Sequence, residues 1–323
     1  MKTRDLLLLA LGLSWLASPA VAQEWPSAKP IRIVVAYPPG GSTDLMARLL
    51  AQKLAPVLGQ TVVVENRPGA AGQIGTAQVA KADADGYTLL FTNAGPGAVG
   101  YALLKSPTYH PVRDFAPVAT MATMPLVMAV GGNSPYRSVA ELIAAAKAQP
   151  GHLNYATTGN GSVSHIATEL FSSMAGIQLT HVPYKGGAQA ITDVIGGQVP
   201  IMFINQDAAL PHVQAGKLNV LAVASPERNP SYPDTPTIAE SGYPGFAAQS
   251  WTGLSAPAGV PEPIIAKLHD ATVQALQSLE LKQRLESVGF VVVGNAPAEY
   301  AAWIEAETRK WGEAIKASGA SVD

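Results

Sequence analysis

Residues 31–44 constrain the fold more than any other segment, because a strand, a turn and the start of a helix follow one another there. Residues 31–36 are almost continuously apolar, which is typical of a parallel strand covered on both faces. The strand must end at the Pro38-Pro39 pair, which cannot extend a sheet, and Gly40 and Gly41 can take backbone angles closed to other residues. The segment therefore predicts a strand–helix unit of an α/β protein.

The helix that follows begins with residues that favour an anion. Ser42 or Thr43 is a good N-cap, and Asp44 suits the positive end of the helix dipole. Free backbone N–H groups, hydroxyls and a helix N-terminus together can bind an anion, so Gly40 and Gly41 join these three as candidate ligand-binding residues. A purely structural turn is the alternative reading. The phosphate-loop pattern G-x-x-x-x-G-K-[ST] and the dinucleotide pattern G-x-G-x-x-G are both absent here.

The first 22 residues have the pattern of a secretory signal peptide. Lys2 and Arg4 precede an apolar run at residues 6–16, and Ala20-Val21-Ala22 is a small-residue cleavage site. We expect cleavage after Ala22. No later run reaches the about 18 apolar residues of a membrane span, and the chain has no cysteine for a disulfide or a lipid anchor. The pattern predicts a freely diffusing periplasmic protein.

Composition and motifs exclude several classes of function. Hydrophobic residues make up 48% of the 323 residues and charged residues 14%, enough apolar surface for about two domains. The net charge of −2 and the lack of a basic cluster argue against a nucleic-acid partner. The six histidines show no metal-binding spacing, and no G-x-S-x-G elbow accompanies Ser164-His165. We therefore expect no metal, no cofactor and no catalytic residues.

Strand and helix patterns alternate in two series, joined by a long apolar stretch at residues 115–130. This order predicts an α/β fold of two doubly wound lobes with a ligand cleft between them. The expected strands are residues 31–36, 61–65, 87–91, 115–130, 153–156, 180–183, 199–204, 219–224 and 290–293; the expected helices are residues 45–58, 74–81, 139–148, 166–174, 188–195, 207–215, 263–277, 279–287 and 297–317.

Ligands in such sheets lie beyond the carboxyl ends of the strands, where four loops are candidates. The first loop (residues 38–44) and the second loop (residues 157–165) each combine glycines, hydroxyls and a following helix. Facing each other, they would clamp a carboxylate from both sides without an arginine. The candidate residues beyond the first loop are Asn93, Thr157, Thr158, Gly159, Ser162, Ser164, His165, Asn205 and Asp207.

Several ordered motifs resemble the Bug-type solute receptors, the periplasmic components of tripartite tricarboxylate transporters. The similarity covers the mature chain and includes residues 38–44, the Gly-rich second loop, Val64-Glu65-Asn66-Arg67-Pro68-Gly69 and Pro257-Ala258-Gly259-Val260-Pro261. The resemblance implies a type II periplasmic-binding-protein fold joined by crossing strands. We expect one lobe at residues 23–124 and 248–323, and the other at residues 125–247.

The resemblance also implies that both loops hold one ligand carboxylate, partly through ordered water. Tyr37 stands where many relatives have phenylalanine and could add a hydroxyl or an aromatic face. Ile204 departs from the Met-Phe-Asp-Asn motif that is common in the family, so polar contact from that position is not expected.

The function expected from the sequence is capture of a small carboxylate by lobe closure and delivery to the membrane components of a tripartite tricarboxylate transporter. The ligand is left open among dicarboxylates, tricarboxylates, amino acids and aromatic acids, because only one carboxylate end is specified. A periplasmic enzyme of the same fold and a ligand-sensing module for a signalling partner are the alternatives.

Overall fold

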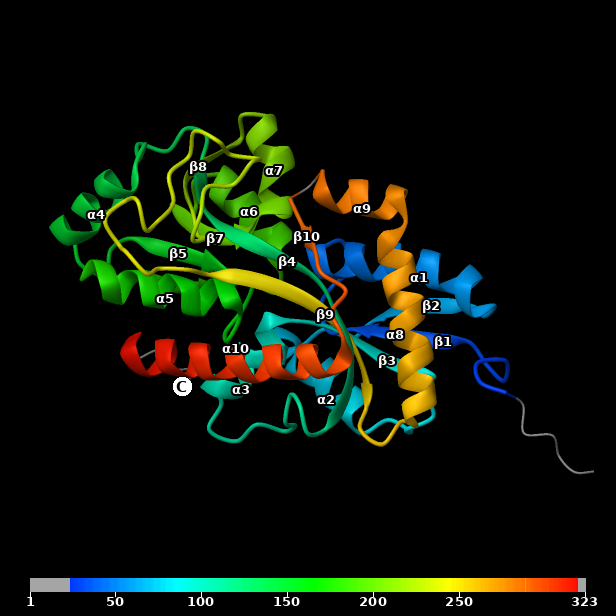
Figure 1. The fold of residues 1–323 in the computed structure, drawn as a ribbon. Helices are drawn as coiled ribbons and strands as arrows, with labels where there is room; N and C mark the ends of the chain where they lie inside the picture. The colour runs from blue at the N-terminus through cyan, green and yellow to red at the C-terminus, as the bar shows by residue number, and fades with distance from the viewer. Residues whose placement is uncertain (1–23, 288, 319–323) are drawn as a thin grey trace, which may run out of the picture.

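A computed structural model describes residues 24–287 and 289–318 of the chain. The predicted signal peptide, residues 1–22, lies outside the described residues. The described chain is an α/β protein, as predicted (Figure 1). Its strands are β1 (Ile31–Val35), β2 (Val62–Asn66), β3 (Thr88–Asn93), β4 (Phe115–Gly131), β5 (Asn154–Thr157), β6 (Thr180–Pro183), β7 (Ile201–Asn205), β8 (Leu218–Val223), β9 (Gln249–Pro257) and β10 (Val291–Val292).

Helices connect most of these strands. They are α1 (Ser42–Leu58), α2 (Gln73–Ala80), α3 (Gly100–Leu103), α4 (Val139–Ala148), α5 (Val163–Ala175), α6 (Gly187–Ile195), α7 (Gln206–Gln214), α8 (Glu262–Gln277), α9 (Leu279–Glu286) and α10 (Pro297–Ser318), with a 3₁₀ turn η1 (Ala70–Gly72) and a π-helical turn η2 (Gly95–Val99). Within the described residues, none of these helices has the length and apolar character needed to cross a membrane.

Strand β4 links the two halves of the sheet. The strand order is β2-β1-β3-β9-β4-β7-β5-β6, and β8 and β10 also pair with β4. The first part of β4, up to Pro125, is antiparallel to β9, while the rest, from Leu126, lies between β7 and β8. The long apolar stretch expected to cross between lobes is therefore a continuous strand. A register shift near Pro117 accommodates one of its two prolines.

Each half of the sheet is covered by helices on both faces, which gives the two lobes of the predicted fold (Figure 1). In the first half, α1 and α8 cover one core and α2 covers another. In the second half, α4 and α5 pack on one face, and α6 and α7 on the other. The C-terminal helix α10 packs against both α5 and α3, so it spans the junction of the halves.

Two segments, β9 and the residues that follow Asn93, lie outside the sequence-based predictions. Strand β9 was expected as part of a return to helices, but it forms the partner of β3 and β4 in the centre of the sheet. Its sequence contains Gly253 and several serines and threonines, so its apolar content is low although it is buried. The turn η2 and helix α3 follow Asn93, where the sequence had indicated only a loop at residues 93–95.

Candidate ligand-binding site

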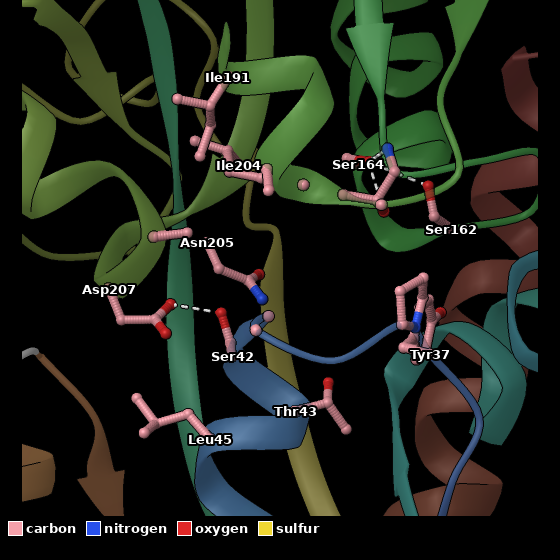
Figure 2. Close-up of a pocket in the computed structure, with 18 of the residues that line it drawn as sticks. Tyr37, Ser42, Thr43, Leu45, Ser162, Ser164, Ile191, Ile204, Asn205 and Asp207 are labelled. Atoms are coloured by element: carbon pink, nitrogen blue, oxygen red, sulfur yellow. Dashed lines mark hydrogen bonds between the residues drawn. The ribbon is translucent and has the colours of Figure 1, made fainter. Parts of the chain in front are cut away.

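The N-termini of α1 and α5 open onto one cavity of about 530 Å³ between the two halves of the sheet. Figure 2 shows Ser42 and Thr43 at the start of α1 on one side, with Ser162 and Ser164 at the start of α5 across the space. Each helix follows the carboxyl end of a strand: α1 follows β1 in one half of the sheet, and α5 follows β5 in the other. The predicted arrangement of two facing loops is therefore present.

The first loop leaves the N-terminus of α1 open. The N-cap is Gly41, not the predicted Ser42 or Thr43, and no side chain caps the helix. The N–H groups of the first turn therefore have neither a helical carbonyl nor a capping oxygen. Of these two glycines, Gly40 has a backbone angle that favours glycine, with φ of 90°, whereas Gly41 is extended, with φ of −88°, a conformation that other residues also adopt.

Asp44 does not line the cavity, because its carboxylate is held by the protein itself. It accepts hydrogen bonds from the Gly40 N–H at 2.9 Å, from Arg48 Nε at 3.0 Å and from Asn66 Nδ2 at 2.8 Å. These donors hold the pKa of the buried carboxyl below its usual range, against the raising effect of burial. Asn66 also donates to the Tyr37 carbonyl at 3.0 Å. Asp44 thus braces the first loop from behind.

The second loop is built from its own hydroxyls. Ser162 is the N-cap of α5 and accepts from the His165 N–H. The Ser164 hydroxyl lies 2.9 Å from the Ser162 hydroxyl and accepts from the Thr158 N–H at 3.1 Å. Ser162, Ser164 and Thr158 all line the cavity. This N-terminus is therefore partly satisfied by the loop, unlike that of α1.

Three predicted site residues lie behind the second loop instead of on the cavity wall. Thr157 is fully buried, with its hydroxyl 2.6 Å from His181 Nε2. His165 stacks on His181 at a ring distance of 4.2 Å, and its Nδ1 accepts from the Gly161 N–H. Burial lowers the pKa of both histidines to about 4, so both are neutral at pH 7. Gly159 lines a separate groove beside Ala71 and Tyr184.

Tyr37 and Asn93 complete the first-lobe wall. The Tyr37 hydroxyl donates to the Ala71 carbonyl at 3.0 Å, so the protein already uses the hydroxyl that the sequence suggested for the ligand. Asn93 donates from Nδ2 to the Thr43 hydroxyl at 2.9 Å and accepts from the Gly95 N–H. Because the Thr43 oxygen accepts from Asn93, its own proton is free to point into the cavity.

One hydrogen bond crosses the cavity. Ser42 at the start of α1 donates to Asp207 Oδ1 at the start of α7 at 2.9 Å (Figure 2). Asp207 is only 8% exposed, and its burial raises the pKa of the carboxyl to about 6. Beside it, the side chain of Asn205 makes no hydrogen bond with any described residue and points toward Ser42.

Most of the predicted site residues therefore share one cavity. Those on its wall are Tyr37, Gly40, Gly41, Ser42, Thr43, Asn93, Thr158, Ser162, Ser164, Asn205 and Asp207. Asp44, Thr157, Gly159 and His165 are off it and support the loops. Among residues 24–287 and 289–318, no group of three candidate metal ligands occurs.

The prediction missed a third wall, formed by the start of α6 and one side of α7. Its residues include Lys185, Gly186, Gly187, Gln189, Ile191, Ile204, Pro211 and His212. A signal was present, because Gly186-Gly187 separates β6 from α6 in the same strand–glycine–helix order as the first loop. The apolar contributors Ile191 and Ile204 carry no comparable signal, since their pattern is that of any buried core residue.

Comparison with known proteins identifies the family. The model of the tripartite tricarboxylate transporter family receptor matches residues 46–320. Over 308 residues, the chain is 40% identical to protein BugT of Bordetella pertussis (strain Tohama I), covering 95% of this chain and 94% of BugT. The chain belongs to the tripartite tricarboxylate transporter receptor family, and its resemblance to Bug proteins is confirmed.

Two solved structures confirm the fold class. R. palustris Rpa4515 with adipate is 36% identical with a TM-score of 0.88, covering 92% of this chain and 99% of that one. MatC (Rpa3494) of Rhodopseudomonas palustris with bound malate is 34% identical with a TM-score of 0.86, covering 90% of this chain and 99% of that one. Both of these relatives were solved with a dicarboxylate.

Proposed function

We propose that this receptor captures a small carboxylate between its lobes in the periplasm and delivers it to the membrane components of a tripartite tricarboxylate transporter. The observation that carries the proposal is the pair of helix N-termini facing one cavity. Each N-terminus has a partial positive charge of about half a unit and N–H groups directed at the space. Such a cavity suits an anion, and the adipate and malate bound to the two relatives are carboxylates.

The amount of binding energy available fits a transport receptor. A hydrogen bond to a charged group contributes about 1.5–3 kcal/mol. Four or five such bonds from the two loops would contribute about 6–15 kcal/mol. This range includes the about 8 kcal/mol of a micromolar site, before the entropy lost on binding is subtracted. The first loop supplies uncapped N–H groups and the Thr43 hydroxyl. The second supplies Ser162 and Ser164.

Binding would favour the closed arrangement of the lobes. We assign residues 23–124 and 248–323 to one lobe and residues 125–247 to the other, with β4 and β9 as the connection between them. A carboxylate can bond to both loops only when they face each other, so its binding energy is differential between open and closed states. The Ser42–Asp207 hydrogen bond would form in the same closure.

Periplasmic location is supported by the signal-peptide pattern of residues 1–22 and by the absence of cysteine from the chain.

The proposed receptor differs from an enzyme of this fold because it binds its ligand without converting it. His165 at the start of α5 and His181 in β6 do not line the cavity. A nucleophile–base pair that faces a ligand is therefore not expected at Ser162 or Ser164.

A thermal-shift screen of the mature chain against a library of mono-, di- and tricarboxylates tests the proposal. A ligand that binds only the native state raises the melting temperature by mass action. We expect at least one carboxylate to stabilise the protein and to be recovered intact by mass spectrometry after prolonged incubation. A protein that is stabilised by no carboxylate, or that converts an excess of its ligand, would refute the receptor function. Co-purification with the transporter membrane subunits tests delivery.

A further inference from the structure

The carboxylate of Asp207 is the one strongly polar group at its end of the cavity that lacks a cationic partner. Among the described residues it forms no ion pair, and its hydrogen-bonding side-chain partner is the neutral hydroxyl of Ser42. It is 92% buried and lies on the cavity wall, near Ser42 and Leu45 (Figure 2). The backbone N–H groups of Asp207 and Ala208 at the start of α7 also donate to this carboxylate. No cation neutralises its charge, and a buried charge without a counter-ion is unfavourable.

The cavity is therefore polarised along its length. At one end, Ser162 and Ser164 present hydroxyls and a helix N-terminus, which suit an anion. At the other end, Asp207 presents an anion and only one of its oxygens accepts a bond from a side chain. Ile191 and Ile204 line the space between, and their apolar side chains suit a hydrocarbon body (Figure 2).

We propose that Asp207 determines specificity, selecting a carboxylate whose far end carries a hydrogen-bond-donating or cationic group such as an ammonium, and disfavouring a second carboxylate. This inference rests on the proposed function, because the first carboxylate must be held by the two loops. A ligand ammonium beside Asp207 would replace a missing partner, whereas a second carboxylate would place two like charges in a site shielded from water. The receptor would then differ in ligand class from its relatives solved with adipate and malate.

The other charged groups near Asp207 do not alter this reading. Lys185 lines the cavity but is exposed, so water solvates its side chain. His212 follows on α7 and is partly exposed. Tyr232 is buried near Asp207, and its pKa is raised to about 12, so the phenol remains neutral. No other charged side chain lines the cavity in the part of the chain that the structure describes.

Two sets of matched probes test the proposal by isothermal titration at pH 8, where Asp207 is ionised. The six-carbon set is adipate, 6-aminohexanoate and hexanoate; the four-carbon set is succinate, 4-aminobutanoate and butanoate. Within a set, the molecules have the same number of carbons and differ only at the last one, which is a carboxylate carbon, a methylene that carries an ammonium, or a methyl group. We expect the amino acid to bind at least tenfold more tightly than the dicarboxylate in the set whose length fits the cavity.

Three variants separate charge from other roles. Asp207→Asn keeps an acceptor for Ser42 but loses the charge, so the preference for the amino acid should fall at least tenfold while binding of the monocarboxylate stays within threefold. Ser42→Ala keeps the charge and should retain the preference. Asp234→Asn, which removes an exposed carboxylate from the same lobe, is the matched control and should bind all probes like the wild type.

The outcomes distinguish the two proposals. Binding of a dicarboxylate as tightly as its amino-acid counterpart, or an unchanged preference in Asp207→Asn, would overturn the role of Asp207 and leave the receptor function standing. Loss of the preference in Ser42→Ala would also overturn it, since the hydrogen bond and not the charge would then decide. Failure of all six probes, together with a negative carboxylate screen, would overturn both.

Discussion

The first and second loops are similar in sequence and opposite in how they are held. The first loop is braced by charge from behind, through Asp44, Arg48 and Asn66, and leaves the start of α1 uncapped. The second loop is braced by neutral groups within itself, and Ser162 caps the start of α5. The same strand–glycine–helix pattern thus produces one open N-terminus and one that is partly satisfied.

This difference indicates which loop contributes more binding energy to a ligand. Uncapped N–H groups lose little on meeting an anion, because their alternative partner is water. Hydroxyls that already bond to one another must share or exchange a partner before they bind a ligand. We therefore expect the first loop to contribute more binding energy and the second to contribute more to shape. The following predictions test that asymmetry, from the largest effect to the smallest.

Gly41→Val should weaken binding of the best carboxylate at least about a hundredfold, which is about 2.7 kcal/mol. A Cβ at Gly41 would meet no atom within 4 Å and the backbone is extended, so the side chain projects into open space without strain. The melting temperature of the unliganded protein should therefore be unchanged. Isothermal titration measures the affinity, with Lys53→Ala as a control on the far part of α1, where Lys53 pairs with Glu280. Equal binding by Gly41→Val would show that α1 does not hold the carboxylate.

Asp44→Ala should lower the free energy of unfolding by about 3 kcal/mol, because it removes an acceptor of three hydrogen bonds at a buried position. Arg48 is half exposed, so the ion pair alone contributes little. Ser164→Ala, the comparable change in the second loop, should cost only about 1 kcal/mol. Urea denaturation of both variants measures the difference. Equal losses would mean that the charged brace is no stronger than the hydroxyl one.

The pH dependence of stability should reflect the second lobe. The pKa values of His165 and His181 are lowered to about 4 by burial, so between about pH 6.5 and 4 the unfolded state binds more protons and stability falls as pH falls. Asp207 acts in the opposite direction, because its raised pKa of about 6 makes the folded state bind the extra proton. On acidification the two histidines lower the free energy of unfolding and Asp207 raises it, so the net loss is about 1.4 kcal/mol per pH unit.

Urea denaturation at pH 7, 6 and 5 measures this slope. Asp207→Asn removes the opposing group and should steepen the loss, whereas His181→Gln should flatten it. A wild-type protein that becomes more stable on acidification over this range would contradict the burial of the two histidines as neutral groups.

The local parts of this architecture could be predicted from sequence. Apolar runs, glycine turns and helix periodicity located both loops and most of the strands, since those signals depend on neighbouring residues. Strand β9 was not predicted, because it is buried by its position between β3 and β4 and not because its own residues are mostly apolar. Such burial is a tertiary property.

The direction of each side chain could not be predicted from the sequence either, because it too depends on tertiary structure. Asp44 and Ser42 are two residues apart, yet one faces Asn66 behind the loop and the other faces Asp207 across the cavity. Asn66 ends β2 and Asp207 begins α7, so partners from distant segments decide which of the two side chains lines the site. The sequence shows that both residues are polar and lie near the start of a helix. A residue that supports the loop from behind and a residue that lines the cavity share these two properties, so the sequence cannot distinguish them.

Adding a cap to α1 and removing the cap of α5 should change stability the least and give the most direct test of the asymmetry. Gly41→Ser offers α1 a capping hydroxyl in a backbone conformation that suits it, so we expect a gain of a few tenths of a kcal/mol in stability and a loss of affinity, because the new oxygen occupies an N–H that the ligand would use. Ser162→Ala removes the cap of α5 and should cost about 1 kcal/mol in stability. Thermal melts and isothermal titration on both variants separate the two quantities. If Gly41→Ser raised stability and affinity together, the open N-terminus of α1 would be a feature of folding and not of the binding site.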